Sequence, residues 1–226
     1  MTKVLLTFDE MFEETYLNPE RIQAFIWRHA ESLIHDSAAF GEKTASDEDA
    51  ALLFHAMEML PHIGIEIQTG EQPQPGKVPL PSNEEIQAWV DHLEGERILH
   101  KGIAAAGSAS MLWKMLLSEK RNDAFLEQNL EVILRHVEVK RKHALLRYSG
   151  ALTCAQIWRE RCGYALVFSR YAIIRQDWRF LNAALKLNEW LWKEFHSPFS
   201  TRAVLPLFAS LVEQEYAFQE LQKCCV

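Results

Sequence analysis

Apolar residues recur at helical spacing in the N-terminal part of the chain. In residues 18–36, Asn18 occupies an N-cap position and Pro19 the first helical position. One side of this predicted helix carries the apolar residues Ile22, Phe25, Ile26 and Leu33. Because steps of three and four residues place side chains on one face, the segment predicts an amphipathic helix that docks on a core.

A second helix is predicted from Ser46, a suitable N-cap followed by acidic residues, to about Leu60. Pro61 should end this helix, because proline has no backbone N–H and disfavours helical angles in the residue before it. The following sequence, HIGIEIQ, alternates isoleucine with other residues, a pattern typical of a strand. We therefore expect a short strand or an extended strap after Pro61.

Residues 69–82, TGEQPQPGKVPLPS, contain four of the eight prolines. Such a composition favours extended backbone, which indicates a linker or a long surface loop. We therefore predict three parts, an acidic N-terminal helical part at 1–68, a Pro-rich linker or loop at 69–82 and a C-terminal helical bundle at 83–226.

Helical spacing continues beyond the Pro-rich segment. Helices are predicted at 83–95, 112–117, 123–146, 153–174, 178–195 and 200–221. Between the first two, the small residues of GIAAAGSAS (102–110) predict a place where two backbones approach each other closely, with a ligand pocket in the gap as the alternative. Together these patterns predict an all-α fold, a multi-helix bundle of antiparallel helices with a long Pro-rich loop and at most one short strand.

Composition is that of a folded globular protein, with 48% hydrophobic and 24% charged residues in a chain of 226. No apolar stretch approaches the roughly 20 residues that span a bilayer, and the N-terminus has acidic residues where a signal peptide would need small neutral ones. The four cysteines form no CxxC pair, which favours a reducing compartment. We therefore predict a soluble cytoplasmic protein that has no membrane partner.

Acidic and basic residues are divided unevenly along the chain. Residues 1–100 contain 19 acidic residues and six Lys or Arg, a net charge of −13, whereas residues 101–226 contain 12 acidic and 18 basic residues, a net charge of +6. The dense basic run from Arg135 to Arg147 lies on a predicted helix, which favours a solvated helix face over a phosphate or RNA site. With an overall net charge of −7, a nucleic-acid partner is not expected.

One predicted helix is apolar on every side, because Arg170 is the only charged residue from Cys162 to Ile174. Such a helix lies inside its bundle, so Arg170 needs either an acidic partner or a route to solvent. The structural interpretation is an internal salt bridge or a side chain that reaches the edge of the bundle. The functional interpretation is an arginine that binds an anionic ligand in a cleft.

Two of the seven tryptophans, Trp190 and Trp192, lie about 200° apart on one predicted helix. One of the two should therefore face something other than its own core. The candidates are a partner chain, a small aromatic or apolar ligand, or a neighbouring helix packed on the opposite side. Trp190, Trp192 and Arg170 are thus the candidate ligand-binding residues.

Three segments place a glutamate four residues before a histidine, namely ESLIH, EMLPH and ERILH at 31–35, 58–62 and 96–100. Chance placement of 24 glutamates and nine histidines gives about one such pair, and a helix favours this spacing without any metal. Carboxylate and imidazole ligands suit iron, manganese or zinc. Candidate metal ligands are therefore Glu31, His35, Glu58 and His62, and no cofactor is expected unless they bind Fe, Mn or Zn.

No catalytic motif emerges from the sequence. GIAAAGSAS lacks the Gly-Lys-Ser/Thr ending of a P-loop, and no G-x-S-x-G sequence is present. We therefore favour a protein-protein interaction or assembly function, in which amphipathic, Trp-rich helical surfaces bind another protein or a second copy of the chain. The alternative is a helical-bundle enzyme or small-ligand binder, with or without a metal, in which Arg170 binds an anion in the cleft.

Overall fold

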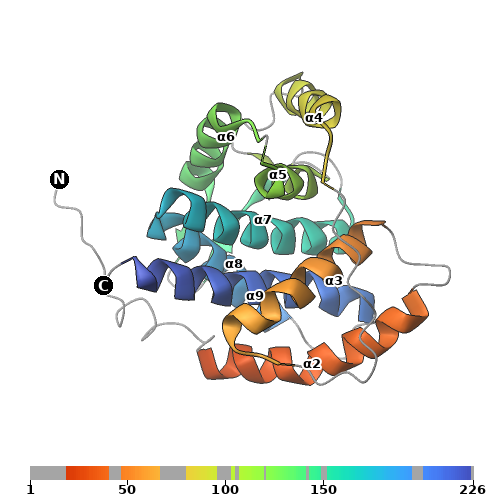
Figure 1. Cartoon of the computed structure of the whole chain (residues 1–226). Coiled ribbons are helices and arrows are strands. Elements are labelled where there is room, and N and C mark those ends of the chain that lie inside the picture. The colour runs from red at the N-terminus through yellow and green to blue at the C-terminus, as the bar shows by residue number, and fades with distance from the viewer. Residues whose placement is uncertain are drawn as a thin grey trace.

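A computed structural model describes residues 19–40, 47–66, 80–95, 103–104, 107–119, 121–140, 143–148, 152–194 and 201–224. The α-helices are α2 (Pro19–Phe40), α3 (Asp47–Met59), α4 (Asn83–Gly95), α5 (Ser108–Leu117), α6 (Asp123–His136), α7 (Cys154–Arg175), α8 (Trp178–Glu194) and α9 (Thr201–Lys223). Short strands are β1 (Ile103–Ala104), β2 (Glu138–Lys140), β3 (His143–Leu145) and β4 (Arg147–Tyr148). The predicted all-α bundle is confirmed (Figure 1).

Helices α7 and α9 cross the middle of the molecule and form the centre of its core (Figure 1). Helix α7 packs against α9, α8 and α5, whereas α9 also packs against α3 and α2. A capping box of Thr153 and Gln156 starts α7 and satisfies backbone N–H groups that the first turn leaves free. As its sequence predicts, α7 is buried on nearly all sides from Tyr164 to Ser169.

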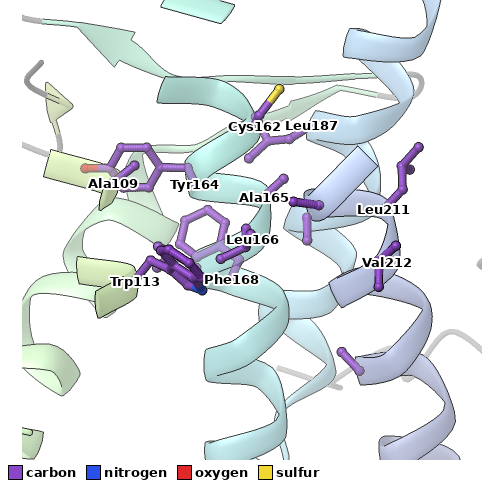
Figure 2. Packing of buried hydrophobic residues seen from close by; sticks show 14 of the residues in the cluster. Ala109, Trp113, Cys162, Tyr164, Ala165, Leu166, Phe168, Leu187, Leu211 and Val212 are labelled. Carbon is purple, nitrogen blue, oxygen red and sulfur yellow. The ribbon is translucent and has the colours of Figure 1, made fainter. Parts of the chain in front are cut away.

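Helix α5 approaches α7 closely at Gly163. A methyl group at Gly163 would lie only 2.7 Å from Cβ of Ala109, so the two helices cross where both side chains are minimal. This contact confirms that the small residues at 102–110 allow a close approach. Just below it, Trp113 of α5 lies against Leu166 and Phe168 of α7 (Figure 2).

The helix predicted at 123–146 is shorter in the structure, because α6 ends at His136 and two strands follow. The backbone N–H of Val137 closes the last turn on the carbonyls of Ile133 and Leu134. Strands β2 and β3 then pair antiparallel, with Val139 opposite Ala144. This pairing overrides the helical spacing of residues 138–140 and 143–145. The basic run thus extends over a helix end and a hairpin.

Strands are more numerous than predicted, although each has only two or three residues. Besides the β2–β3 hairpin, β1 pairs in parallel with β4. The expected strand or strap after Pro61 begins instead with a 3-10 turn at Leu60–Ile63, which ends at Gly64 in the left-handed region with φ of 77°. The break that Pro61 was expected to cause is confirmed, because α3 ends at Met59.

Helices from both sides of the Pro-rich segment contribute to one hydrophobic core, which reaches from Ile22 in α2 to Leu221 in α9. Within residues 69–82, only 80–82 belong to the described part of the chain. The proposed division into an N-terminal part, a linker and a C-terminal bundle therefore stays a prediction.

Candidate functional site

Three charged or ionisable side chains from three different helices meet inside the bundle. Glu213 of α9 is fully buried, and its Oε1 lies 2.7 Å from Nε of Arg170 on α7. Its Oε2 accepts hydrogen bonds from Nη2 of Arg170 at 3.0 Å and from Nε2 of His55 on α3 at 2.6 Å. We call Arg170, Glu213 and His55 the charge cluster.

The charges of this cluster hold Glu213 in its ionised form. Burial alone would raise the pKa of the Glu213 carboxyl, but the charges of Arg170 and His55 and their hydrogen bonds outweigh burial and lower this pKa. Because an ionised carboxylate only accepts hydrogen bonds, Nε2 of His55 is the nitrogen that carries hydrogen, and its N–H donates a hydrogen bond to Glu213.

Aromatic and sulfur atoms enclose the charge cluster. The His55 ring meets Trp113 edge-on, with ring centroids 5.2 Å apart. The guanidinium of Arg170 lies 5.6 Å from the ring of Tyr216, and its Nη2 is 3.6 Å from the sulfur of Met59. Arg170 is 17% exposed, so the cluster reaches the surface through this one side chain. Of the two interpretations of Arg170, the structure shows the internal salt bridge; its assignment as a ligand-binding residue stays a prediction.

A pocket of about 20 Å³ lies at the junction of four helices, near the first turns of α3 and α5. Its lining includes Glu48, Leu52, Trp113, Arg159, Glu160 and Pro206, contributed by α3, α5, α7 and α9. A volume of this size holds about one water molecule or one small polar group.

Glu160 forms one wall of this pocket and caps α5. Its carboxylate accepts hydrogen bonds from the backbone N–H groups of Gly107, at 2.5 Å, and Ala109, at 3.2 Å. These are N–H groups that a helix leaves without partners at its first turn. Burial raises the pKa of Glu160 and the nearby charge of Glu48 adds to the increase, although the two backbone hydrogen bonds oppose it.

The rings of the two candidate tryptophans contact other helices of the same chain. The guanidinium carbon of Arg161 on α7 lies 3.7 Å from the ring centroid of Trp190. Trp192 packs edge-on against Phe25 of α2, with centroids 5.0 Å apart. Both tryptophans remain partly exposed. These contacts agree with the interpretation that each tryptophan packs against a neighbouring helix. The binding of a ligand at either ring stays a prediction.

The candidate metal ligands are not brought together in the part that the structure describes. Glu58 and His62 are exposed, and the His62 ring lies 5.7 Å from that of Tyr216. Glu31 and His35 lie on α2, but their side chains are outside the described part, as are residues 96–100. No group of three or more His, Cys, Asp or Glu side chains among the described residues is arranged to hold a metal. A site at Glu31 and His35 remains a hypothesis.

Sequence reasoning missed most residues of the charge cluster and the pocket. For His55 the available signal was its isolation in the apolar sequence AALLFHAM, whereas Glu213 is followed directly by the polar residues Gln214 and Glu215. The pairing of His55 with Glu213 could not be predicted from the sequence, because the two positions are 158 residues apart.

Comparison with known proteins gives no relative from which a role could be transferred. No family model, no curated protein and no solved structure matches the chain. None of the described helices combines the length and apolar character needed to cross a bilayer.

Proposed function

We propose that the chain is a protein-protein interaction or assembly protein and that α2 carries part of its binding surface. The observation behind this proposal is Trp27, which is 48% exposed although the opposite face of α2 is buried. Gln23 and Ala24 precede it by one helical turn and are also exposed, so they border the indole on the same face. Tryptophan is enriched in the energetic centres of protein interfaces.

The exposed part of Trp27 is large enough to matter for binding. Tryptophan offers up to about 250 Å² to a contact, so roughly 120 Å² of Trp27 is open to solvent. Burying this area contributes at most about 3 kcal/mol, or roughly a hundredfold in the dissociation constant. A partner that covers the ring therefore gains a usable share of its affinity there.

The proposed setting is the reducing cytoplasm. Cys154, Cys162 and Cys224 are free thiols, and such residues are typical of a reducing compartment. The competing hypothesis, an enzyme or ligand binder with Arg170 as its anion site, is less favoured because Glu213 already neutralises the guanidinium.

Site-specific photocrosslinking in cells tests the interaction surface. A photoreactive phenylalanine analogue replaces Trp27 in one variant and the exposed Asp91 of α4 in a control variant. We expect a discrete adduct from position 27 and none from position 91. When the W27A variant is purified without crosslinking, the partner identified by the adduct should no longer co-purify, whereas it should co-purify with D91A. If position 27 gives no adduct with another protein or with a second copy, the proposal is wrong.

A further inference from the structure

Two residues that line the pocket, Trp113 and Arg159, each carry a buried hydrogen-bond donor that has no acceptor among the described residues. Trp113 is 1% exposed, and its indole N–H has no acceptor among the described residues. Nε of Arg159 is also buried and has no hydrogen bond within that part of the chain. Oε2 of Glu48 lies 3.8 Å from this nitrogen, too far for a hydrogen bond. Both residues line the same pocket.

An unpaired buried donor is costly, which makes two donors at one pocket informative. Asp49 occupies Nη2 of Arg159 and leaves Nε available. The indole of Trp113 is held between α5 and α7 and has no freedom to turn towards solvent (Figure 2). An occupant that satisfies these two donors must therefore supply an oxygen atom with free lone pairs.

The same pocket also presents acceptors. Oε2 of Glu160 accepts hydrogen bonds from the backbone N–H of Ala109 and the hydroxyl of Ser108, whereas Oε1 accepts one from the backbone N–H of Gly107 and keeps a further lone pair. Glu48 lies at the rim with its side chain 34% exposed, opposite Arg159 at 37%, so the pocket is open to solvent there. An occupant therefore meets donors and acceptors together, beside apolar groups of Leu52 and Pro206.

The charge and size of the pocket further limit which chemical groups can occupy it. A carboxylate or phosphate would satisfy the donors but would face the carboxylates of Glu48 and Glu160. An ammonium group would satisfy the carboxylates but would leave Trp113 and Arg159 without an acceptor. A hydroxyl both accepts and donates, is uncharged, and fits a volume of about 20 Å³.

We propose that this pocket binds one hydroxyl group of a neutral polyhydroxylated ligand, such as a polyol or a sugar. The hydroxyl oxygen accepts from the indole N–H of Trp113 or from Nε of Arg159, and its proton is donated to the carboxylate of Glu160 or Glu48. The remainder of the ligand lies at the rim beside Glu48 and Arg159. This site is separate from the Trp27 surface and does not depend on the proposed interaction function.

The indole N–H signal of Trp113 reports on this site directly. Protein labelled with ¹⁵N in tryptophan gives one indole signal for each of the seven residues, and Trp113→Phe identifies the signal in question. Glycerol, myo-inositol and glucose are titrated separately into the millimolar range. We expect at least one of them to shift the Trp113 signal in a saturable way while the signal of exposed Trp27 does not saturate. If Trp113→Phe fails to fold, through-bond assignment of the wild-type indole signals replaces it.

A second variant tests the donor pairing. Arg159→Met should weaken ligand binding about tenfold, as expected for one lost hydrogen bond. Arg175→Met is the matched control, because Arg175 lies on the same helix but pairs on the surface with Glu127, and it should leave binding unchanged. The proposal is overturned if no polyol moves the Trp113 signal and only a bound water is detected beside it. Equal affinity in Arg159→Met and the wild type would also overturn it.

Discussion

Burial, and not the number of contacts, should decide how much each arginine contributes to stability. Arg170 and Arg179 both have carboxylate partners at 2.6–2.7 Å, and hydrogen bonds to Asp177 raise the pKa of Arg179. However, the Arg179 side chain is 59% exposed, whereas Arg170 is 17% exposed and its partner Glu213 is fully buried. Water and salt screen the ion pairs of Arg179, so the raised pKa of Arg179 does not imply a large contribution to the free energy of unfolding.

The expected magnitudes follow from what each substitution leaves behind. Arg170→Met leaves the Glu213 carboxylate buried without its guanidinium, which should lower the free energy of unfolding by about 3–5 kcal/mol. The matched substitution Arg179→Met should cost at most about 1 kcal/mol. Combining Arg170→Met with Glu213→Leu removes both charges, and the cycle should show a coupling of about 2 kcal/mol or more.

Urea unfolding at pH 7 gives the free energy of unfolding of each variant. Equal slopes of this free energy against urea concentration would show that the variants expose the same surface on unfolding. His55 is not substituted in any of these variants. It loses its hydrogen-bond acceptor, and so adds to the loss of unfolding free energy, only where Glu213 is replaced. The reasoning is refuted if Arg179→Met destabilises the protein as much as Arg170→Met, or if the effects of Arg170→Met and Glu213→Leu simply add.

Three further predictions concern the core. Gly163→Ala should destabilise the fold in thermal melts, because overpacking against Ala109 costs about 1–3 kcal/mol and outweighs the roughly 1 kcal/mol helix preference of alanine; adding Ala109→Gly should restore the loss, and no rescue would contradict the contact. The pKa of Glu213 is lowered by folding, so its contribution to stability is complete above about pH 4.5 and declines as the pH falls through the folded pKa; the gap in unfolding free energy between wild type and Glu213→Gln should therefore narrow in acid, and a constant gap would disprove the assignment. Burial raises the pKa of the Cys162 thiol, so a disulfide reagent should label exposed Cys154 in the folded protein and Cys162 only on unfolding; equal rates would show that α7 opens.

Helices were predictable where one face is apolar, as in α2, because the spacing of Ile22, Phe25 and Ile26 depends on neighbouring residues alone. The hairpin after His136 was not predictable, because its sequence, which is rich in charged residues and leucine, fits the spacing of a helix as well as that of a strand. The strand there depends on pairing between β2 and β3, and such tertiary contacts override local propensity.

The candidate site was predictable only in part, for a related reason. Arg170 stood out because it is a single charge in an apolar helix. Its partner Glu213 did not, because α9 also carries Gln214 and Glu215 beside it, and three adjacent polar residues read as a solvent-facing segment. In the structure all three are buried.

Burial on all sides of α9 also explains why its polar residues are needed. A helix without an exposed face cannot be oriented by an apolar stripe alone. On α9, Glu213 pairs with α7 and α3, while Ser210 and Gln214 hydrogen-bond to Asn188 of α8 at 2.9 and 2.8 Å. Slippage of α9 by one turn would leave these groups unpaired, at about 1–3 kcal/mol each.

Polar pairing on α9 therefore also affects the proposed binding surface around Trp27. Helix α2 packs on α9, and its Phe25 contacts Trp192 of α8 edge-on. With α9 held in register from three sides, the α2 face that carries Trp27 has one position relative to the core. A partner that binds this face does not have to order it first, so most of the free energy from covering Trp27 contributes to affinity.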